Sequence, residues 1–402
     1  MNKPRILFWH RKDLRIFDNQ ALIKAFSLSN AITSTYIFDK NYSHDFNASS
    51  RAWFLGNSLQ ELGNNWKKMG SRLIMEEGDP VLIIPQLAKK IDAKFVFQFK
   101  DIDNKLKENK TINSSDSVLE KFIKNIKFPG SNICPCRPGE NAAETLLENF
   151  INEKKIYSYN SARDFPSHNG TSFLSASLRF GTISIRKIWN ATLNLNSDFA
   201  NQGNYLSIET WQKELVWREF YQHCLFHFPE LEKGPYRKKW DHFPWQNNNE
   251  WFQHWSNGET GVPIVDAAMR QLNSTGWMHN RCRMIVASFL VKDLICNWQM
   301  GEKKFMETLV DGDLAANNGG WQWSASSGMD PKPLRIFNPY TQAKKFDPIC
   351  EYIKYWIPEL SKVSNSELLN GEISNLEKNN YSSPIVNHNI QQRLFKSLYA
   401  EI

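Results

Sequence analysis

Short apolar runs alternate with helical patterns through the first hundred residues, and this alternation restricts the fold more than any other feature. The apolar runs span residues 6–9, 35–38, 72–75 and 95–99, and the helical patterns between them span residues 19–28, 51–69 and 80–90. Strands that alternate with helices imply a parallel, doubly wound sheet. No Gly-x-Gly-x-x-Gly motif follows the first strand, so the usual dinucleotide fingerprint is missing from this part of the chain.

The rest of the chain has a different pattern. Residues 101–135 are rich in Lys, Asn, Asp and Ser, which favours a linker with one short helix over residues 117–126. From residue 136 onward helical periodicity dominates. We therefore predict an α/β N-terminal domain (1–100), a shortened linker (101–135) and an all-α domain (136–402).

Composition sets broad limits on function. A hydrophobic content of 41% with 23% charged residues is typical of a globular protein, and no apolar stretch is long enough to cross a bilayer. We therefore expect a cytoplasmic protein without a membrane partner. The six cysteines lack paired spacing, which indicates reduced thiols rather than a metal site. The net charge of +7 permits a nucleic-acid partner but does not establish one.

One helical face combines aromatic and charged side chains. Trp211, Glu214 and Arg218 are spaced to share a face, with Trp217 at its edge. The simpler interpretation is an exposed Glu214–Arg218 ion pair, worth roughly 0.3–0.5 kcal/mol. Two indoles beside the carboxylate favour a functional site, and both interpretations stay open.

Two further segments have compositions that suggest sites. Hydroxyl side chains at 171, 172 and 175 precede a helical pattern, where they form either an anion site or an ordinary helix N-cap. Residues 311–323 hold two acids, two adjacent asparagines and two indoles. On a helix Asn317 and Trp321 share a face, and small residues let a flat group approach the backbone. Adjacent Asn and Gly pairs lower helix propensity, so a loop is the alternative.

Several motifs together resemble one family. They are the stretch from Thr260 to Trp323 beginning TGVPIVDAAMRQL, TSFLS at 171–175, WREFY at 217–221, RIFNP at 335–339 and the opening segment 11–19. They resemble the class I cyclobutane pyrimidine dimer photolyases of the cryptochrome/photolyase family, over about residues 1–100 and 135–360. The resemblance implies blue-light-driven repair of UV-damaged DNA by a monomeric carbon–carbon lyase. In that reaction, excited reduced FAD lends an electron to a flipped-out dimer.

The resemblance also implies a flavin site in the helical domain. The residues that hold the diphosphate would be Tyr159, Thr171, Ser172, Leu174 and Ser175. Those that line the flavin and adenine would be Trp211, Arg218, Asn280, Arg283, Asp311 and Asp313. Arg283 and Asp311 would form an ion pair beside the ring, and Asn317 would face flavin N5.

A lesion site and an electron path follow from the same resemblance. Trp217 and Trp323 would stack on the dimer, Met284 would pack beside it, and Glu214 would hydrogen-bond a base carbonyl. Arg163, Arg281 and Arg335 would contact DNA phosphates; a solvated basic face is the alternative. Trp321, Trp298 and Trp245 would carry electrons from solvent to the flavin. Core packing explains each of these indoles alone.

The chain departs from the family pattern in two places. The family has further residues after the fourth strand, where this chain has the short polar segment 100–129, so we expect a shortened sheet. Residues 97–101 read FQFKD where folate-binding members carry an acidic residue, which leaves the antenna (folate or deazaflavin) open.

Two other functions remain as alternatives. They are a cryptochrome-type photoreceptor without repair activity and a flavin-free nucleic-acid-binding module. Asn280 and Met284 favour cyclobutane dimers over (6-4) products, because (6-4) photolyases have His at the position of Asn280. Plant-type cryptochromes often have Asp at the position of Asn317 and a long C-terminal tail.

Overall fold

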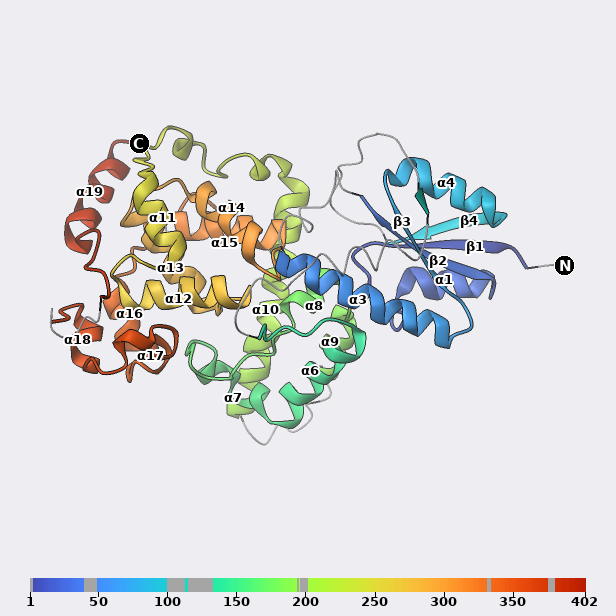
Figure 1. Cartoon of the computed structure of the whole chain (residues 1–402), viewed down its shortest axis with the longest axis horizontal. Coiled ribbons are helices and arrows are strands. Elements are labelled where there is room, and N and C mark those ends of the chain that lie inside the picture. Colours follow the sequence, from blue (N-terminus) through green and yellow to red (C-terminus); the bar gives the residue numbers. More distant parts are fainter. Residues whose placement is uncertain are drawn as a thin grey trace. The chain divides into compact units, whose positions relative to one another are not determined.

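The computed structural model describes residues 3–39, 49–99, 113–114, 133–193, 195, 202–330, 334–374 and 380–402. The chain forms two compact units (Figure 1). The first contains Met1–Phe128, Pro135–Lys154 and Ser172–Gln202, and the second contains Pro129–Cys134, Lys155–Thr171 and Gly203–Ile402.

The first unit is built on the predicted parallel sheet. Its parallel strands are β1 (Arg5–His10), β2 (Ile32–Phe38), β3 (Leu73–Glu77) and β4 (Ala93–Gln98). The strand order is β4-β1-β2-β3-β5, in which β5 (Asn113–Ser114) pairs antiparallel with β3. The doubly wound α/β prediction is confirmed. The sequence did not indicate β5, because two residues are too few to leave a periodic pattern.

Helices cover both faces of this sheet. The first three are α1 (Gln20–Leu28), α3 (Ser49–Lys68) and α4 (Pro80–Lys90), close to the predicted ranges. Asn19 caps α1 by accepting from the Leu22 amide, and Asp79 caps α4 by accepting from the Val81 amide. Figure 1 shows α4 on one face and α1 and α3 on the other, as right-handed crossovers in this strand order require.

The first unit also takes in segments that we assigned to the helical domain. These include α6 (Glu140–Asn152), α8 (Ser175–Phe180) and α9 (Ile185–Leu193). The buried carboxylate of Glu140 accepts hydrogen bonds from the amides of Ile16 and Phe17, at 3.1 and 2.9 Å. This contact ties α6 to the loop after β1, so the compact units divide the chain differently from the predicted boundary at residue 136.

The second unit is helical, as predicted. Its helices are α7 (Lys155–Ala162), α10 (Gln202–His227), α11 (Asn249–Asn257), α12 (Pro263–Thr275), α13 (Asn280–Lys292), α14 (Trp298–Thr308), α15 (Leu314–Ala325), α16 (Pro339–Phe346), α17 (Glu351–Trp356), α18 (Asn365–Asn370) and α19 (His388–Ala400). One large core cluster joins α11–α19, with Trp255 and Phe289 fully enclosed. This cluster holds α13, α14 and α15 in fixed positions beneath the candidate site.

Some predictions lie wholly or partly outside the described residues. The short helix at 117–126, most of the linker at 101–135 and the last two residues of the segment 97–101 belong to that group. Within the described residues, no helix is long and apolar enough to cross a membrane. The same part of the chain contains no cluster of three or more His, Cys, Asp or Glu residues with metal-binding geometry.

Candidate functional site

Helix α10 carries the predicted aromatic and charged face. Trp211 is buried, whereas Trp217 is 41% exposed. The Glu214 carboxylate pairs with Arg163, which follows α7, at 2.5 Å between Oε1 and Nη1. The ion pair found for Glu214 is thus a long-range one with Arg163. Arg218 Nη2 donates to the side-chain oxygen of Gln222 at 3.0 Å, with the Gln222 amide oriented so that its oxygen faces the guanidinium.

Two of the three arginines assigned to phosphates form one ion-pair cluster. Asp164 lies between them, 2.7 Å from Arg281 Nη2 and 3.9 Å from Arg163 Nε. The guanidinium of Arg281 also lies over the ring of Phe346, at 4.2 Å from its centroid. Arg335 is exposed in the segment before α16 and is not part of this cluster. Phosphate binding at Arg163 and Arg281 therefore has to compete with neighbouring carboxylates.

A second ion pair joins α13 to the loop before α15. Arg283 Nη2 lies 3.1 and 2.8 Å from the two carboxylate oxygens of Asp311, whose side chain is only 4% exposed. Arg283 Nε also donates to the carbonyl of Met278. The ion pair expected from the resemblance is confirmed. A buried pair with this many hydrogen bonds fixes a guanidinium in one place, which a cofactor site requires.

Residues 314–325 form helix α15 rather than a loop. The carboxylate of Asp313 caps the helix by accepting from the Ala316 amide at 3.1 Å. This cap offsets the low propensity of the Asn and Gly pairs. Asn317 donates through Nδ2 to the carbonyl of Glu302 at 3.0 Å. Its side-chain oxygen is therefore the atom left to face a ligand.

Glu302 on α14 was missed by the sequence analysis. Its carboxylate accepts from Asn318 Nδ2 at 2.9 Å, so both asparagines of α15 are bonded to this one residue. Burial raises the pKa of Glu302 to about 7, although the Asn318 hydrogen bond favours the ionised form. A single glutamate on an amphipathic helix looks like a surface residue, so no sequence signal would have indicated it.

Glu302 should make stability depend on pH. Because its pKa is higher in the folded protein than in the unfolded chain, the protonated Glu302 carboxyl stabilises the fold. This contribution to stability is complete below the usual pKa of 4.5 and is lost as the pH rises through about 7. We expect the stability of Glu302→Gln relative to wild type to increase by about 1–2 kcal/mol between about pH 5 and 8. Urea unfolding at the two pH values measures this. Glu307→Gln, an exposed position on the same helix, is the control, and identical profiles for wild type and Glu302→Gln would contradict the expectation.

Aromatic rings gather where α10 meets α15. Trp217 and Trp323 lie edge to face, with ring centroids 5.4 Å apart, and Trp217 also contacts Phe220 and Tyr221. A Cβ atom at Gly319 would lie 2.1 Å from the Tyr221 ring. The flat group that approaches the backbone at Gly319 is therefore a tyrosine of the protein, whereas a Cβ atom at Gly320 would meet nothing within 4 Å outside its own helix backbone.

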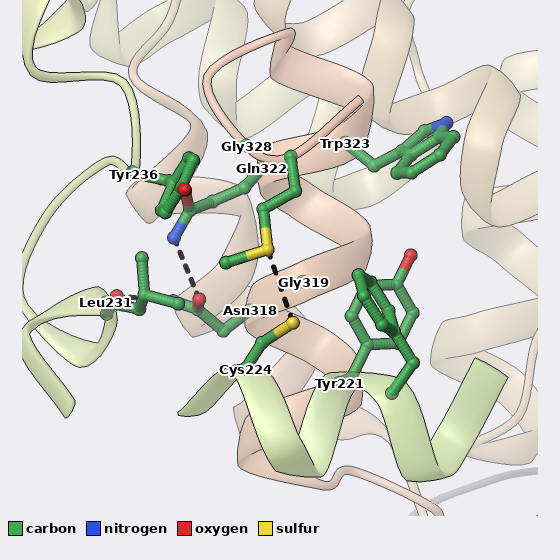
Figure 2. A pocket seen from close by; sticks show the side chains of 11 residues that line it. Tyr221, Cys224, Leu231, Tyr236, Asn318, Gly319, Gln322, Trp323 and Gly328 are labelled. Atoms are coloured by element: carbon green, nitrogen blue, oxygen red, sulfur yellow. Dashed lines mark hydrogen bonds between the residues drawn. The ribbon is translucent and has the colours of Figure 1, made fainter. Parts of the chain in front are cut away.

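An open pocket lies beside these rings (Figure 2). Its walls are mainly aromatic and sulfur-containing side chains, and Figure 2 shows Tyr221 and Trp323 along one side. The amides of Asn318 and Gln322 bond to each other at 2.8 Å, and the Gln322 oxygen accepts from the Tyr236 amide. Because these polar groups are already satisfied, the pocket offers an apolar surface.

The three tryptophans of the predicted electron path all belong to the core cluster or pack against it. Trp321 and Trp298 are each 2% exposed, and Trp245 is partly buried. The Trp321 ring packs so closely on α14 that a Cβ atom at Gly301 would lie 2.1 Å from it. Its other ring contacts include Phe305 at 5.0 Å and Trp255 at 6.1 Å. The sequence analysis did not single out Trp255.

The remaining predicted binding residues are divided between the two units. Tyr159 and Thr171 lie in the second unit, and Ser172, Leu174 and Ser175 lie in the first. Helix α8 has Leu174 as its N-cap residue and no side-chain cap, so the ordinary N-cap interpretation is wrong. Asn280 is the exposed first residue of α13, and the Met284 sulfur lies 3.9 Å from Arg281 Nη1.

The polar groups fit the cofactor that the resemblance implies. Among the described residues, Thr171 Oγ1 is buried without a hydrogen-bond partner, as is Nε1 of Trp321. Buried hydroxyls are normally hydrogen-bonded, so Thr171 is suited to donate to an acceptor such as a phosphate oxygen. The fixed guanidinium of Arg283 and the oriented amide of Asn317 add polar groups that suit a flavin ring.

Family comparisons agree with this arrangement. Residues 211–401 match the model described as the FAD binding domain of DNA photolyase, and residues 6–157 match the DNA photolyase model. A deoxyribodipyrimidine photo-lyase of Synechococcus is 42% identical over 468 residues, covering 99% of this chain and 96% of that protein. One from Agrobacterium fabrum is 34% identical, covering 89% of this chain and 88% of that protein.

Solved structures give the same result. The crystal structure of a bacterial class III photolyase from Agrobacterium tumefaciens has a TM-score of 0.87 and 31% identity, with 100% of this chain and 98% of that chain covered. An archaeal photolyase from Sulfolobus tokodaii has a TM-score of 0.79 and 30% identity, with 99% and 100% covered. The fold and the helical site define a flavoprotein with an α/β domain and an FAD-binding domain. The chain belongs to the cryptochrome/photolyase family.

Proposed function

We propose that the protein is a deoxyribodipyrimidine photo-lyase that uses blue light and FAD to split cyclobutane pyrimidine dimers in DNA. The observation that carries the proposal is the 42% identity to the Synechococcus enzyme over nearly the full length of both proteins. When bound in its reduced form, FAD supplies light-driven transfer of an electron to the lesion. The residues of the chain bind, orient and shield the reacting groups.

The flavin-holding residues act through fixed polar atoms. Arg283, balanced by Asp311, presents a cation of fixed position, and Asn317 presents its side-chain oxygen to the ring edge. Trp211, Arg218, Asn280 and Asp313 complete the flavin and adenine contacts. The diphosphate is held by Tyr159, Thr171, Ser172, Leu174 and Ser175, among which the buried Thr171 hydroxyl still lacks an acceptor in the described residues.

The lesion is held by the aromatic residues of α10 and α15. A dimer is extruded more easily than a sound base pair, because its stacking and pairing are already weakened. The exposed ring of Trp217, with Trp323 edge-on beside it, offers a stacking surface, and Met284 packs next to the lesion. Glu214 donates a carboxyl O–H hydrogen bond to a base carbonyl, and it must loosen its pair with Arg163 to do so.

Arg163, Arg281 and Arg335 contribute phosphate contacts. Each neutralised phosphate releases counterions, so affinity for DNA should fall steeply with salt. When DNA approaches, Arg163 exchanges Glu214 for a phosphate, which frees the carboxylate for the lesion at the moment it is needed. Trp321, Trp298 and Trp245 would form the path that carries electrons from solvent to a bound flavin.

Light-dependent repair tests the proposal directly. The purified protein should carry FAD and should restore a UV-irradiated oligonucleotide containing cyclobutane dimers under blue light but not in the dark. An oligonucleotide with a (6-4) product is the matched control and should remain unrepaired. Bound FAD without light-dependent repair would instead support the photoreceptor alternative, and a protein that cannot be loaded with FAD would refute both.

Finer assignments belong to the same proposal. We assign the chain to class I on the motifs that begin at Thr171, Trp217, Thr260 and Arg335, and grouping with class III enzymes in a tree of both classes would overturn this. We also propose a monomer that acts in the cytoplasm, tested by size-exclusion chromatography and cell fractionation. Residues 136–402 are the proposed FAD- and DNA-binding domain. An absorption spectrum of the isolated protein would show whether a folate or deazaflavin antenna accompanies FAD.

A further inference from the structure

Lys292 is a charged residue in the core that none of the roles above uses. It is the last residue of α13 and only 1% exposed. Lysine is almost never fully buried unless its ammonium group has partners. Its Nζ donates a hydrogen bond to the backbone carbonyl of Arg335. A lysine buried in the core therefore bonds to the backbone of Arg335, whose side chain is exposed.

The segment around Arg335 is held by three such bonds. The Leu334 amide donates to Ser326 Oγ at 3.2 Å, and the Phe337 amide donates to Ser288 Oγ at 3.3 Å. Ser288 and Lys292 are four residues apart on α13, so both lie on the face that supports the segment. Leu334 adopts a left-handed backbone (φ 68°), which leucine rarely does. This conformation depends on the bonds around it.

The charges around Lys292 do not offset the desolvation cost of burying its ammonium group. Asp293, the C-cap residue that follows α13, favours the ammonium form of Lys292, although that carboxylate is also paired with His388 of α19 at 2.5 Å. Asp330, after α15, favours the ammonium form, and the Arg335 guanidinium opposes it. Tyr340 of α16 is influenced by Asp293 and stays neutral, because burial raises its pKa to about 12. Burial is the largest effect on Lys292 and lowers its pKa to about 7.

We propose that Lys292 is a positioning residue for DNA binding, which holds the Arg335 segment so that the Arg335 side chain meets a phosphate. The proposal rests on the proposed function only in taking Arg335 as a phosphate contact. An ammonium group donates a stronger hydrogen bond than a neutral amine. The support of the segment is therefore complete in acid and weakens as the pH rises through neutrality.

The experiment compares Lys292→Met with Lys303→Met, an exposed lysine on α14 (78% exposed). Fluorescence anisotropy with a dimer-containing duplex measures Kd from about pH 6 to 8, where lysines of ordinary pKa do not titrate. We expect Lys292→Met to raise Kd about fivefold at the acid end and to flatten its pH dependence. Lys303→Met should keep the wild-type pH profile.

A double-mutant cycle with Arg335→Ala separates positioning from general loss of structure. Arg335→Ala should lower the slope of log K against log salt by about 0.9, as one lost phosphate contact requires. Adding Lys292→Met to Arg335→Ala should change Kd by less than about twofold, because both act through the same contact. Additive effects, or an Arg335→Ala protein with wild-type affinity, would overturn the proposal.

A second variant keeps the test decisive if Lys292→Met fails to fold. Ser288→Ala removes another bond to the segment and should show a smaller loss of affinity that again vanishes in the Arg335→Ala background. If the effects of Ser288→Ala and Arg335→Ala on Kd were additive, the proposal would likewise be rejected. Failure of the proposed function would look different, since wild-type protein would then not prefer dimer-containing DNA over undamaged duplex at any pH.

Discussion

Trp321→Phe protein is expected to bind FAD normally but to lose photoreduction of the oxidised cofactor to background under blue light. Phenylalanine fills most of the space that the indole occupies against Gly301 and Phe305, so the core should remain intact. It is far harder to oxidise than indole and cannot supply the electron. Repair by chemically reduced protein should persist, because the lesion lies outside this path. Absorbance of oxidised flavin under illumination, with an external reductant present, measures the loss.

Trp255 supplies a matched control for this prediction. Its buried ring touches that of Trp321, with centroids 6.1 Å apart, and its Nε1 donates to the carbonyl of Val286. If the path runs through Trp298 and Trp245, Trp255→Phe should photoreduce at the wild-type rate, whereas Trp298→Phe should not. If Trp255→Phe lost photoreduction while Trp298→Phe kept it, the electron path would run through Trp255 instead of Trp298. Normal photoreduction in Trp321→Phe would show that the proposed tryptophan path is wrong.

Glu214→Ala should lower the repair yield about 10- to 100-fold while FAD remains bound. In the proposed mechanism the carboxyl group hydrogen-bonds charge that develops on the lesion, and such bonds are strong where water is excluded. The same substitution frees Arg163 from its 2.5 Å pair, so affinity for dimer-containing DNA should be equal to or greater than that of wild type. Repair per photon and Kd are measured on the same protein.

Two further variants test the roles of Glu214 and Arg163 separately. Glu214→Gln keeps a hydrogen-bonding group without the charge and should recover part of the yield. Arg163→Ala should bind DNA more weakly while repairing the bound fraction with nearly normal yield. If Glu214→Ala repaired as well as wild type, or lost DNA affinity as Arg163→Ala does, the assigned roles would be wrong.

Local patterns predicted the elements of the fold well. The strands β1–β4 and the helices α1, α3 and α4 were visible because apolar spacing and caps such as Asn19 and Asp79 act within a few residues. The grouping of α6 with the sheet was not visible. It depends on Glu140 bonding to backbone amides more than a hundred residues earlier, and no local pattern reports such a contact.

One pairing of the candidate site was predicted from the sequence, and others were not. Family resemblance supplied the Arg283–Asp311 pair, and the structure contains it. Spacing alone drew attention to Glu214 and Arg218, which are neighbours on a helix, whereas the pair with Arg163 spans 51 residues. Glu302 and Lys292 escaped notice for the same reason, since a charged residue in an amphipathic pattern carries no sign of its burial.

The contact at Gly319 sets the geometry of the stacking surface. Tyr221 of α10 lies against the bare backbone of α15 there, at a distance that leaves no room for even one methyl group. The two helices also carry Trp217 and Trp323, whose mutual angle and distance follow from how closely the helices approach. Gly319 lies one turn before Trp323 on the same face of α15, so the absence of a side chain at Gly319 sets how closely the Trp217 and Trp323 rings can approach each other.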